Sequence, residues 1–166
     1  DINKYILKKI SQIKPDTLIL FSNYLNQSDV RILGDEITYD ALINEELSKI
    51  KKLGVKKIIL VGQIPTWIST LPKVLARKFL GKSLPVPDRT FTGVTGNSLE
   101  WDNVLKAQNY GDDIIYVSLK EQLCNEGGCL TYVSNDRERD LIVFDYGHLT
   151  PVGADYVTNE LLAPLL

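Results

Sequence analysis

The chain has 166 residues, 44% of them hydrophobic and 24% charged, and this balance favours a single folded domain over a disordered chain. Its formal net charge of -2 provides no overall positive field to attract nucleic acid. No apolar run approaches the ~20 residues that a membrane-spanning helix needs, and no signal peptide is recognisable. Because the sequence contains no methionine, we expect the native protein to continue upstream of Asp1.

The first part of the chain alternates amphipathic helices with short apolar strands. Helices are predicted over residues 2–13 and 39–53, and strands over residues 17–21 and 57–61. The apolar stripe of the first helix consists of Ile2, Tyr5, Ile6, Ile10 and Ile13. The inward face of the second helix consists of Ile43, Leu47 and Ile50.

Two more helices are predicted in the middle of the chain, over residues 71–80 and up to about residue 109. Asn97 or Ser98 is the predicted N-cap of the second of them. Residues 81–98 are rich in Gly, Pro, Thr and Ser and predict a long irregular loop, a kind of segment that is often functional.

The last part of the chain predicts further strands and one helix. The strand candidates are 113–118, 129–133 and 141–144, and the last of these is alternatively a buried extended segment. Thr150 is the predicted N-cap of the final helix, with Pro151 at its first position. Strands and helices in this alternation predict a three-layer αβα fold with a central parallel sheet, as in flavodoxin-like proteins.

The only two cysteines, Cys124 and Cys129, flank the sequence Asn-Glu-Gly-Gly. Residues this close on either side of a Gly-Gly turn can satisfy the geometry of a disulfide, which would indicate an oxidising compartment. Two reduced cytosolic thiols are the alternative. A metal site would need further ligands, and the only histidine lies well downstream, so no metal is expected.

The strongest chemical signal is the sequence Asp145-Tyr146-Gly147-His148-Leu149-Thr150. A turn of this length allows the Asp145 carboxylate to accept a hydrogen bond from Nδ1 of His148, which leaves Nε2 free as a general base. Gly147 is expected to let the backbone bend between them. The alternative is an aspartate that caps a turn beside a surface histidine without a role.

This block resembles the Asp-x-x-His-Leu-Ser/Thr block that ends the SGNH (GDSL-like) hydrolase and acyltransferase fold. The apolar segments 18–24 and 58–65 and the segment between the two cysteines are similar to one branch of it, the periplasmic SGNH domain fused to acyltransferase-3 membrane proteins. The resemblance spans nearly the whole chain and implies one SGNH-like domain over residues 1–166 that lacks its first strand. It implies catalytic roles for Asp145 and His148.

The chain departs from the family at the nucleophile, because no Gly-Asp-Ser sequence occurs in it. The resemblance implies that this serine lies upstream of Asp1. Ser22 and Ser118 follow predicted strands, but neither lies in a strand-turn-helix elbow, and both are interpreted as turn hydroxyls. Asn23, also at a strand end, is a candidate oxyanion donor.

The resemblance implies an O-acetyltransferase domain that acetylates a cell-surface polysaccharide by a Ser-His-Asp mechanism. Its partners would be the glycan acceptor, an acyl donor and an attached membrane acyltransferase domain, in the periplasm or another extracytoplasmic space. No cofactor and no nucleic acid are expected. Trp67 and Tyr146 are candidates for an apolar platform under a sugar or acyl group, although an aromatic beyond a strand is more often a core residue.

Two other functions remain open at this point. One is a secreted carbohydrate esterase of the same fold, and the other is a non-catalytic module that binds glycan or scaffolds a membrane enzyme. A generic flavodoxin-like domain is disfavoured, because no Gly-rich phosphate loop follows a strand.

Overall fold

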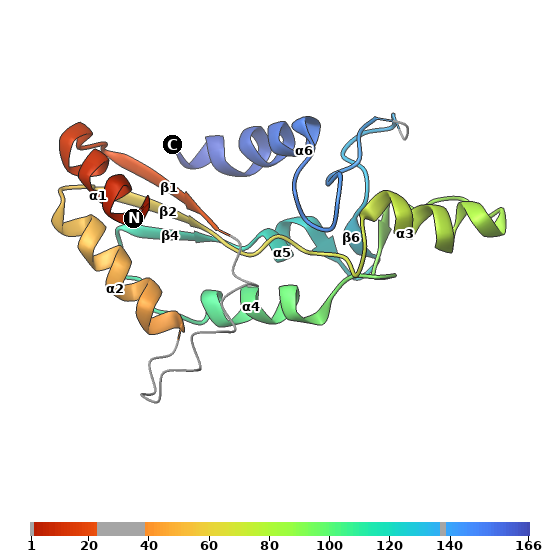
Figure 1. The fold of residues 1–166 in the computed structure, drawn as a ribbon, viewed down its shortest axis with the longest axis horizontal. Coiled ribbons are helices and arrows are strands. Elements are labelled where there is room, and N and C mark those ends of the chain that lie inside the picture. The colour runs from red at the N-terminus through yellow and green to blue at the C-terminus, as the bar shows by residue number, and fades with distance from the viewer. Residues whose placement is uncertain (1, 23–38, 137–138) are drawn as a thin grey trace. The chain divides into compact units, whose positions relative to one another are not determined.

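The computed structural model describes residues 2–22, 39–136 and 139–166, which form two compact units (Figure 1). The first unit comprises residues 1–62 and 103–117, and the second comprises residues 63–102 and 118–166. Helix α4 (Gly96–Lys106) contributes to both. That the whole chain is one domain therefore stays a prediction.

A parallel sheet of three strands forms the centre of the first unit (Figure 1). Its strands are β1 (Thr17–Phe21), β2 (Lys57–Val61) and β4 (Ile114–Val117), with β2 in the middle. Ile58 of β2 lies opposite Leu18 on one side and Ile114 on the other. Strand β2 is almost completely buried, as expected of the central strand, and the prediction of an α/β fold with a parallel sheet is confirmed.

Helices α1 (Ile2–Ile13) and α2 (Tyr39–Lys52) pack on one face of this sheet. The buried side chains of this core are Ile10, Leu47, Ile50, Val55, Ile58 and Leu60. The inward face predicted for α2 is correct. The stripe predicted for α1 is confirmed at Ile10, which is buried, but Tyr5, Ile6 and Ile13 are exposed. Leu7, which was not predicted, packs against the core.

The second unit combines short helices with a small antiparallel sheet. The helical elements are α3 (Leu71–Lys78), η2 (Leu80–Lys82), α5 (Leu119–Leu123), α6 (Pro151–Tyr156), the π-helix η3 (Val157–Leu162) and the 3-10 helix η4 (Ala163–Leu165). The strands are β3 (Arg89–Thr90), β5 (Cys124–Asn125) and β6 (Gly128–Leu130), in the order β3-β6-β5. The segment predicted as an irregular loop therefore contains a strand, and the strand predicted at 129–133 is shorter and starts earlier.

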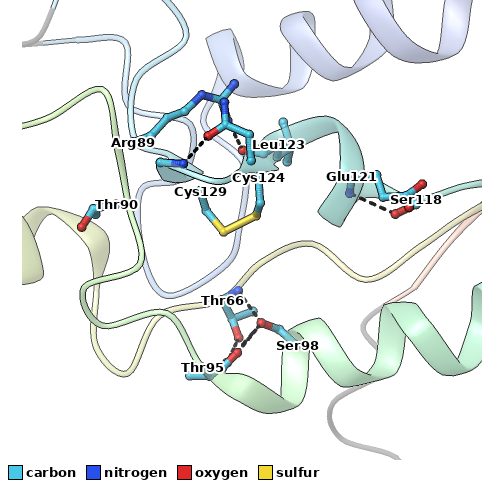
Figure 2. The surroundings of a disulfide bond; sticks show 12 residues. Thr66, Arg89, Thr90, Thr95, Ser98, Ser118, Glu121, Leu123, Cys124 and Cys129 are labelled. Carbon is cyan, nitrogen blue, oxygen red and sulfur yellow. Dashed lines mark hydrogen bonds between the residues drawn. A yellow bond between two sulfur atoms is a disulfide. The ribbon is translucent and has the colours of Figure 1, made fainter.

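The disulfide predicted from the cysteine spacing is present between Cys124 and Cys129, which also face each other in the β5–β6 pair (Figure 2). Arg89 of β3 donates a hydrogen bond from Nη1 to the backbone oxygen of Leu123, 2.6 Å away. Gly128 has a φ of +121°, and a Cβ at this position would lie 2.4 Å from the backbone carbon of Thr90. The backbones of the hairpin and β3 are therefore in direct contact.

Residues 141–144 form a buried extended segment rather than a regular strand. Leu141 and Val143 make isolated antiparallel bridges with Tyr132 and Leu149. The cap predicted for the final helix is confirmed, since the hydroxyl of Thr150 accepts a hydrogen bond from the N–H of Gly153 at 3.0 Å. Within the described residues, no helix combines the length and the apolar character needed to cross a membrane.

Candidate active site

Asp145 and His148 lie in the loop of a closed hairpin that precedes α6. Val143 and Leu149 form its antiparallel bridge, and the N–H of Phe144 donates a hydrogen bond to the backbone oxygen of His148 at 3.0 Å. Because the ends of the loop are tied together, the relative position of Asp145 and His148 is set by this short stretch of chain.

The carboxylate of Asp145 accepts three hydrogen bonds from its own hairpin. Oδ1 accepts from the backbone N–H groups of Gly147 at 2.9 Å and His148 at 2.8 Å. Oδ2 lies 2.6 Å from Nδ1 of His148. With the carboxylate ionised, Nδ1 must be the donor of this bond, so Nε2 of the neutral imidazole carries the lone pair.

The imidazole is open to incoming molecules. The His148 side chain is 59% exposed, whereas that of Asp145 is 22% exposed. Among the described residues, no side chain or backbone group forms a hydrogen bond with Nε2. An oriented imidazole with a free, accessible Nε2 is the arrangement that a general base requires.

The pKa of Asp145 lies below its ordinary value of 3.8. Partial burial of the carboxyl group raises this pKa, but the hydrogen bonds from the Gly147 and His148 N–H groups and from the His148 side chain, together with the charge of His148, lower it by more. The site therefore keeps Asp145 ionised at neutral pH, so that it can orient the imidazole.

The lowered pKa of Asp145 predicts an acid-dependent contribution to folding stability. The folded carboxylate binds its proton less readily than the unfolded one, so its stabilisation is complete well above pH 3.8 and is lost as the pH falls through the folded-state pKa. We expect the difference in unfolding free energy between the natural chain and Asp145→Asn, measured by urea unfolding, to shrink from about pH 5 downwards. A difference that stays constant across this range would contradict the assignment of these hydrogen bonds.

Two exposed aromatic rings flank the imidazole. Phe144 stacks on His148 with ring centroids 5.9 Å apart, and Tyr146 contacts it edge-on at 5.4 Å. Their exposed fractions are 57% and 42%. Trp67, by contrast, is buried, so the structure favours a core role for Trp67 over the platform considered from the sequence.

Two residues that follow β2 in the sequence form backbone hydrogen bonds with the hairpin. The N–H of Trp67 donates to the backbone oxygen of Tyr146 at 2.8 Å, and that of Leu71 donates to the backbone oxygen of Asp145 at 2.9 Å. Gly147 lies in a bend at residues 144–147, as expected, but its φ is not positive, so the bend itself does not require a glycine. The need for a glycine at position 147 is steric, because a Cβ there would lie 2.8 Å from Cγ2 of Thr66.

The other candidate residues have separate positions. Asn23 lies outside the described residues. Ser22 is exposed after β1, in the first unit. Ser118 caps α5, where its hydroxyl accepts from the N–H of Glu121 and donates to Oδ2 of the buried Asp102 at 2.6 Å, as expected of a structural hydroxyl.

The predicted N-cap of α4 is wrong, because the helix begins at Gly96 and Ser98 lies inside its first turn. The hydroxyl of Ser98 is fully buried, donates to the backbone oxygen of Thr95 at 2.9 Å and accepts from the N–H of Thr66 at 3.1 Å. Ser98 therefore ties the start of α4 to the segment that supports the hairpin.

A shallow surface depression of about 290 Å³ lies elsewhere in the second unit. Asp140, Asp155 and Glu160 are among its lining residues, but Asp145 and His148 are not. In the described parts of the chain, no three His, Cys, Asp or Glu side chains are grouped as metal ligands.

Two contacts at this site were not anticipated from the sequence. Phe144 was assigned only to an apolar segment, and its position beside the imidazole follows from the hairpin. Thr66 was not singled out, although it lies in the stretch after β2, and the carboxyl ends of parallel strands are where binding residues gather.

Comparison with known proteins places these features in a family. The family model described as an SGNH domain fused to AT3 domains matches residues 1–163, and the chain belongs to this family. The periplasmic domain of the lipopolysaccharide acetyltransferase of Salmonella ser. Paratyphi A is similar in structure, with a TM-score of 0.79 and 26% sequence identity over 98% of this chain. The chain spans 61% of the length of that solved chain. No curated protein matches the sequence.

These findings confirm the resemblance drawn from the Asp145–Thr150 block and the predicted αβα class of the fold.

Proposed function

We propose that the chain is the SGNH domain of an O-acetyltransferase that transfers an acetyl group to a hydroxyl of a cell-surface polysaccharide. The observation that carries this proposal is the 2.6 Å contact between Asp145 and Nδ1 of His148, with Nε2 exposed. Membership of a family of domains fused to AT3 domains, and likeness to a lipopolysaccharide acetyltransferase domain, support acyl transfer as the chemistry.

In the proposed mechanism His148 is the general base for a serine nucleophile, which we do not assign to any of the 166 residues. Nε2 takes the hydroxyl proton as the serine oxygen attacks the acyl carbonyl carbon, and it returns this proton to the leaving group when the tetrahedral intermediate collapses. A sugar hydroxyl then attacks the acyl-serine, gives its proton to Nε2 and leaves with the acetyl group, and the proton returns to the serine oxygen.

Asp145 holds the imidazole in the productive tautomer and stabilises the imidazolium that forms in each half-reaction. Its two backbone N–H donors keep the carboxylate fixed while the charge of the imidazole changes. Asn23, if its side chain reaches the acyl oxygen, supplies an oxyanion donor in this scheme.

The exposed rings of Phe144 and Tyr146 support a carbohydrate as the acyl acceptor. Aromatic faces provide apolar contact to sugar rings, and here both rings lie against the imidazole that would receive the proton of the acceptor hydroxyl. A sugar stacked on either ring would bring a hydroxyl close to Nε2.

We further propose that the domain works in the periplasm or another extracytoplasmic space, beside a membrane acyltransferase domain that provides the acyl group. The description of the family as fused to AT3 domains and the periplasmic origin of the similar solved domain support this location. The disulfide between Cys124 and Cys129 agrees with an oxidising compartment.

The proposal is tested by product analysis on the complete native protein with a radiolabelled acetyl donor and a surface polysaccharide. We expect acetyl ester on the polysaccharide, with little free acetate, and covalent labelling of a serine by a fluorophosphonate. Release of acetate alone, regardless of the acceptor, would assign an esterase. No turnover and no labelled serine would assign the non-catalytic module.

A further inference from the structure

We propose that Thr66 is a positioning residue for His148. Its methyl group lies against Gly147 and fixes where the hairpin that carries Asp145 and His148 lies relative to the segment after β2. The expected effect on activity rests on the proposed function, whereas the contact between Thr66 and Gly147 does not. The two residues are far apart in the sequence.

The contact explains why position 147 is a glycine. Its backbone conformation is open to any residue, because its φ is not positive. A Cβ at this position would lie 2.8 Å from Cγ2 of Thr66, and also 3.7 Å from its Cβ. Cβ contacts below 3.0 Å essentially never occur, so a side chain at position 147 would force either Thr66 or the hairpin to shift.

Thr66 cannot move aside easily, because hydrogen bonds hold it on several sides (Figure 2). Its hydroxyl lies 2.6 Å from that of Thr95, its N–H donates to the hydroxyl of Ser98 at 3.1 Å, and its backbone oxygen accepts from the N–H of Thr95 at 2.8 Å. The side chain is 2% exposed. The methyl group of Thr66 is therefore a fixed surface.

The position of Gly147 affects the dyad directly. Its N–H donates to Oδ1 of Asp145, and the next N–H, that of His148, donates to the same oxygen. The flanking residues Asp145 and Tyr146 are held by Leu71 and Trp67 through their backbone oxygens. A displacement of Gly147 against these fixed neighbours must distort the loop and weaken the hydrogen bonds that orient the carboxylate and the imidazole.

The test is a cycle of Gly147→Ala, Thr66→Ser and the double variant. Thr66→Ser removes Cγ2 and keeps the hydroxyl, so it makes room for the new Cβ. We expect Gly147→Ala to lower kcat by about 10²-fold with little change in KM, because small displacements of catalytic groups have effects of this size. Thr66→Ser alone removes the contact but inserts no new atom, so it should lower kcat only several-fold, and the double variant should regain activity to the level of Thr66→Ser.

Gly96→Ala is the matched control, because Gly96 has no positive φ and a Cβ there meets nothing within 4 Å. It should leave kcat unchanged. Thermal unfolding of each variant separates loss of fold from loss of position.

A second readout does not depend on activity. His148 is the only histidine among these 166 residues. In the native protein, its imidazole ¹⁵N and ¹H resonances are identified as those that disappear in His148→Ala. We expect Gly147→Ala to lose the slowly exchanging Nδ1–H signal and to mix the two tautomers, and the double variant to restore both features.

The outcomes separate the positioning role from the function. If the double variant has the low kcat and the altered imidazole signals of Gly147→Ala, the role of Thr66 is overturned. It is also overturned if Gly147→Ala itself has normal kcat and normal imidazole signals. Recovery of the Nδ1–H signal in a protein with no acyl turnover in any form would uphold the positioning and reject the proposed function.

Discussion

Replacing His148 with alanine is expected to lower kcat for acetyl transfer by about 10⁴-fold. In the proposed mechanism no other group takes the proton of the serine or of the sugar hydroxyl, so both half-reactions lose their base. The side chain is 59% exposed, and the two rings that contact it are exposed as well, so the free energy of unfolding should change little. Acetyl transfer and urea unfolding, measured on the same protein, check the two parts together.

Lys73→Ala is a suitable control for this comparison, because Lys73 lies on the exposed side of α3 in the same unit. It should retain full activity. If His148→Ala also kept more than about a tenth of the natural rate, general-base catalysis by this residue would be refuted.

Gly128→Ala is expected to destabilise the fold by about 3 kcal/mol or more. The φ of +121° is unfavourable for any residue with a Cβ. The added atom would also lie 2.4 to 2.5 Å from three backbone atoms of Thr90, which a rotamer change cannot relieve. The pairing of β6 with β3 would therefore open.

The neighbouring glycine provides an internal comparison. A Cβ on Gly127 would meet only Oδ1 of Asn125, at 3.3 Å, and Gly127 does not have a positive φ. Gly127→Ala should therefore cost less than about 1 kcal/mol in urea unfolding. Equal losses for the two variants would show that the β3–β6 contact does not determine the stability of this region.

Elements fixed by local pattern were predictable from the sequence. Strands β1 and β2 have continuous apolar character, and the Thr150-Pro151 cap marks the last helix, so each was located within a residue or two. Strand β3 was missed because it is only two residues long and exists through its pairing with β6, far along the chain. The exposed side of α1 was missed because periodicity identifies an apolar stripe but not the part of it that reaches the sheet.

In the candidate site, too, local features could be predicted and contacts between distant parts of the chain could not. The spacing of Asp145 and His148 allowed their hydrogen bond, because both residues lie in one turn, but it left equally open an aspartate that caps a turn beside a histidine without a role. The reason for Gly147 was not predictable. It depends on the methyl group of Thr66, which the fold brings from another part of the chain, and no periodicity in the sequence reports such a contact.

The closed hairpin that carries Asp145 and His148 also affects how such a domain can evolve. In the part of the chain that the structure describes, every hydrogen bond of the Asp145 side chain is made within four consecutive residues. One short stretch of gene therefore encodes both partners and their geometry. Recombination elsewhere in the gene leaves the pair intact, while a small deletion in this stretch removes both at once. Asp145 and His148 are thus inherited as one unit, and any residue that works with them from elsewhere in the chain can change independently.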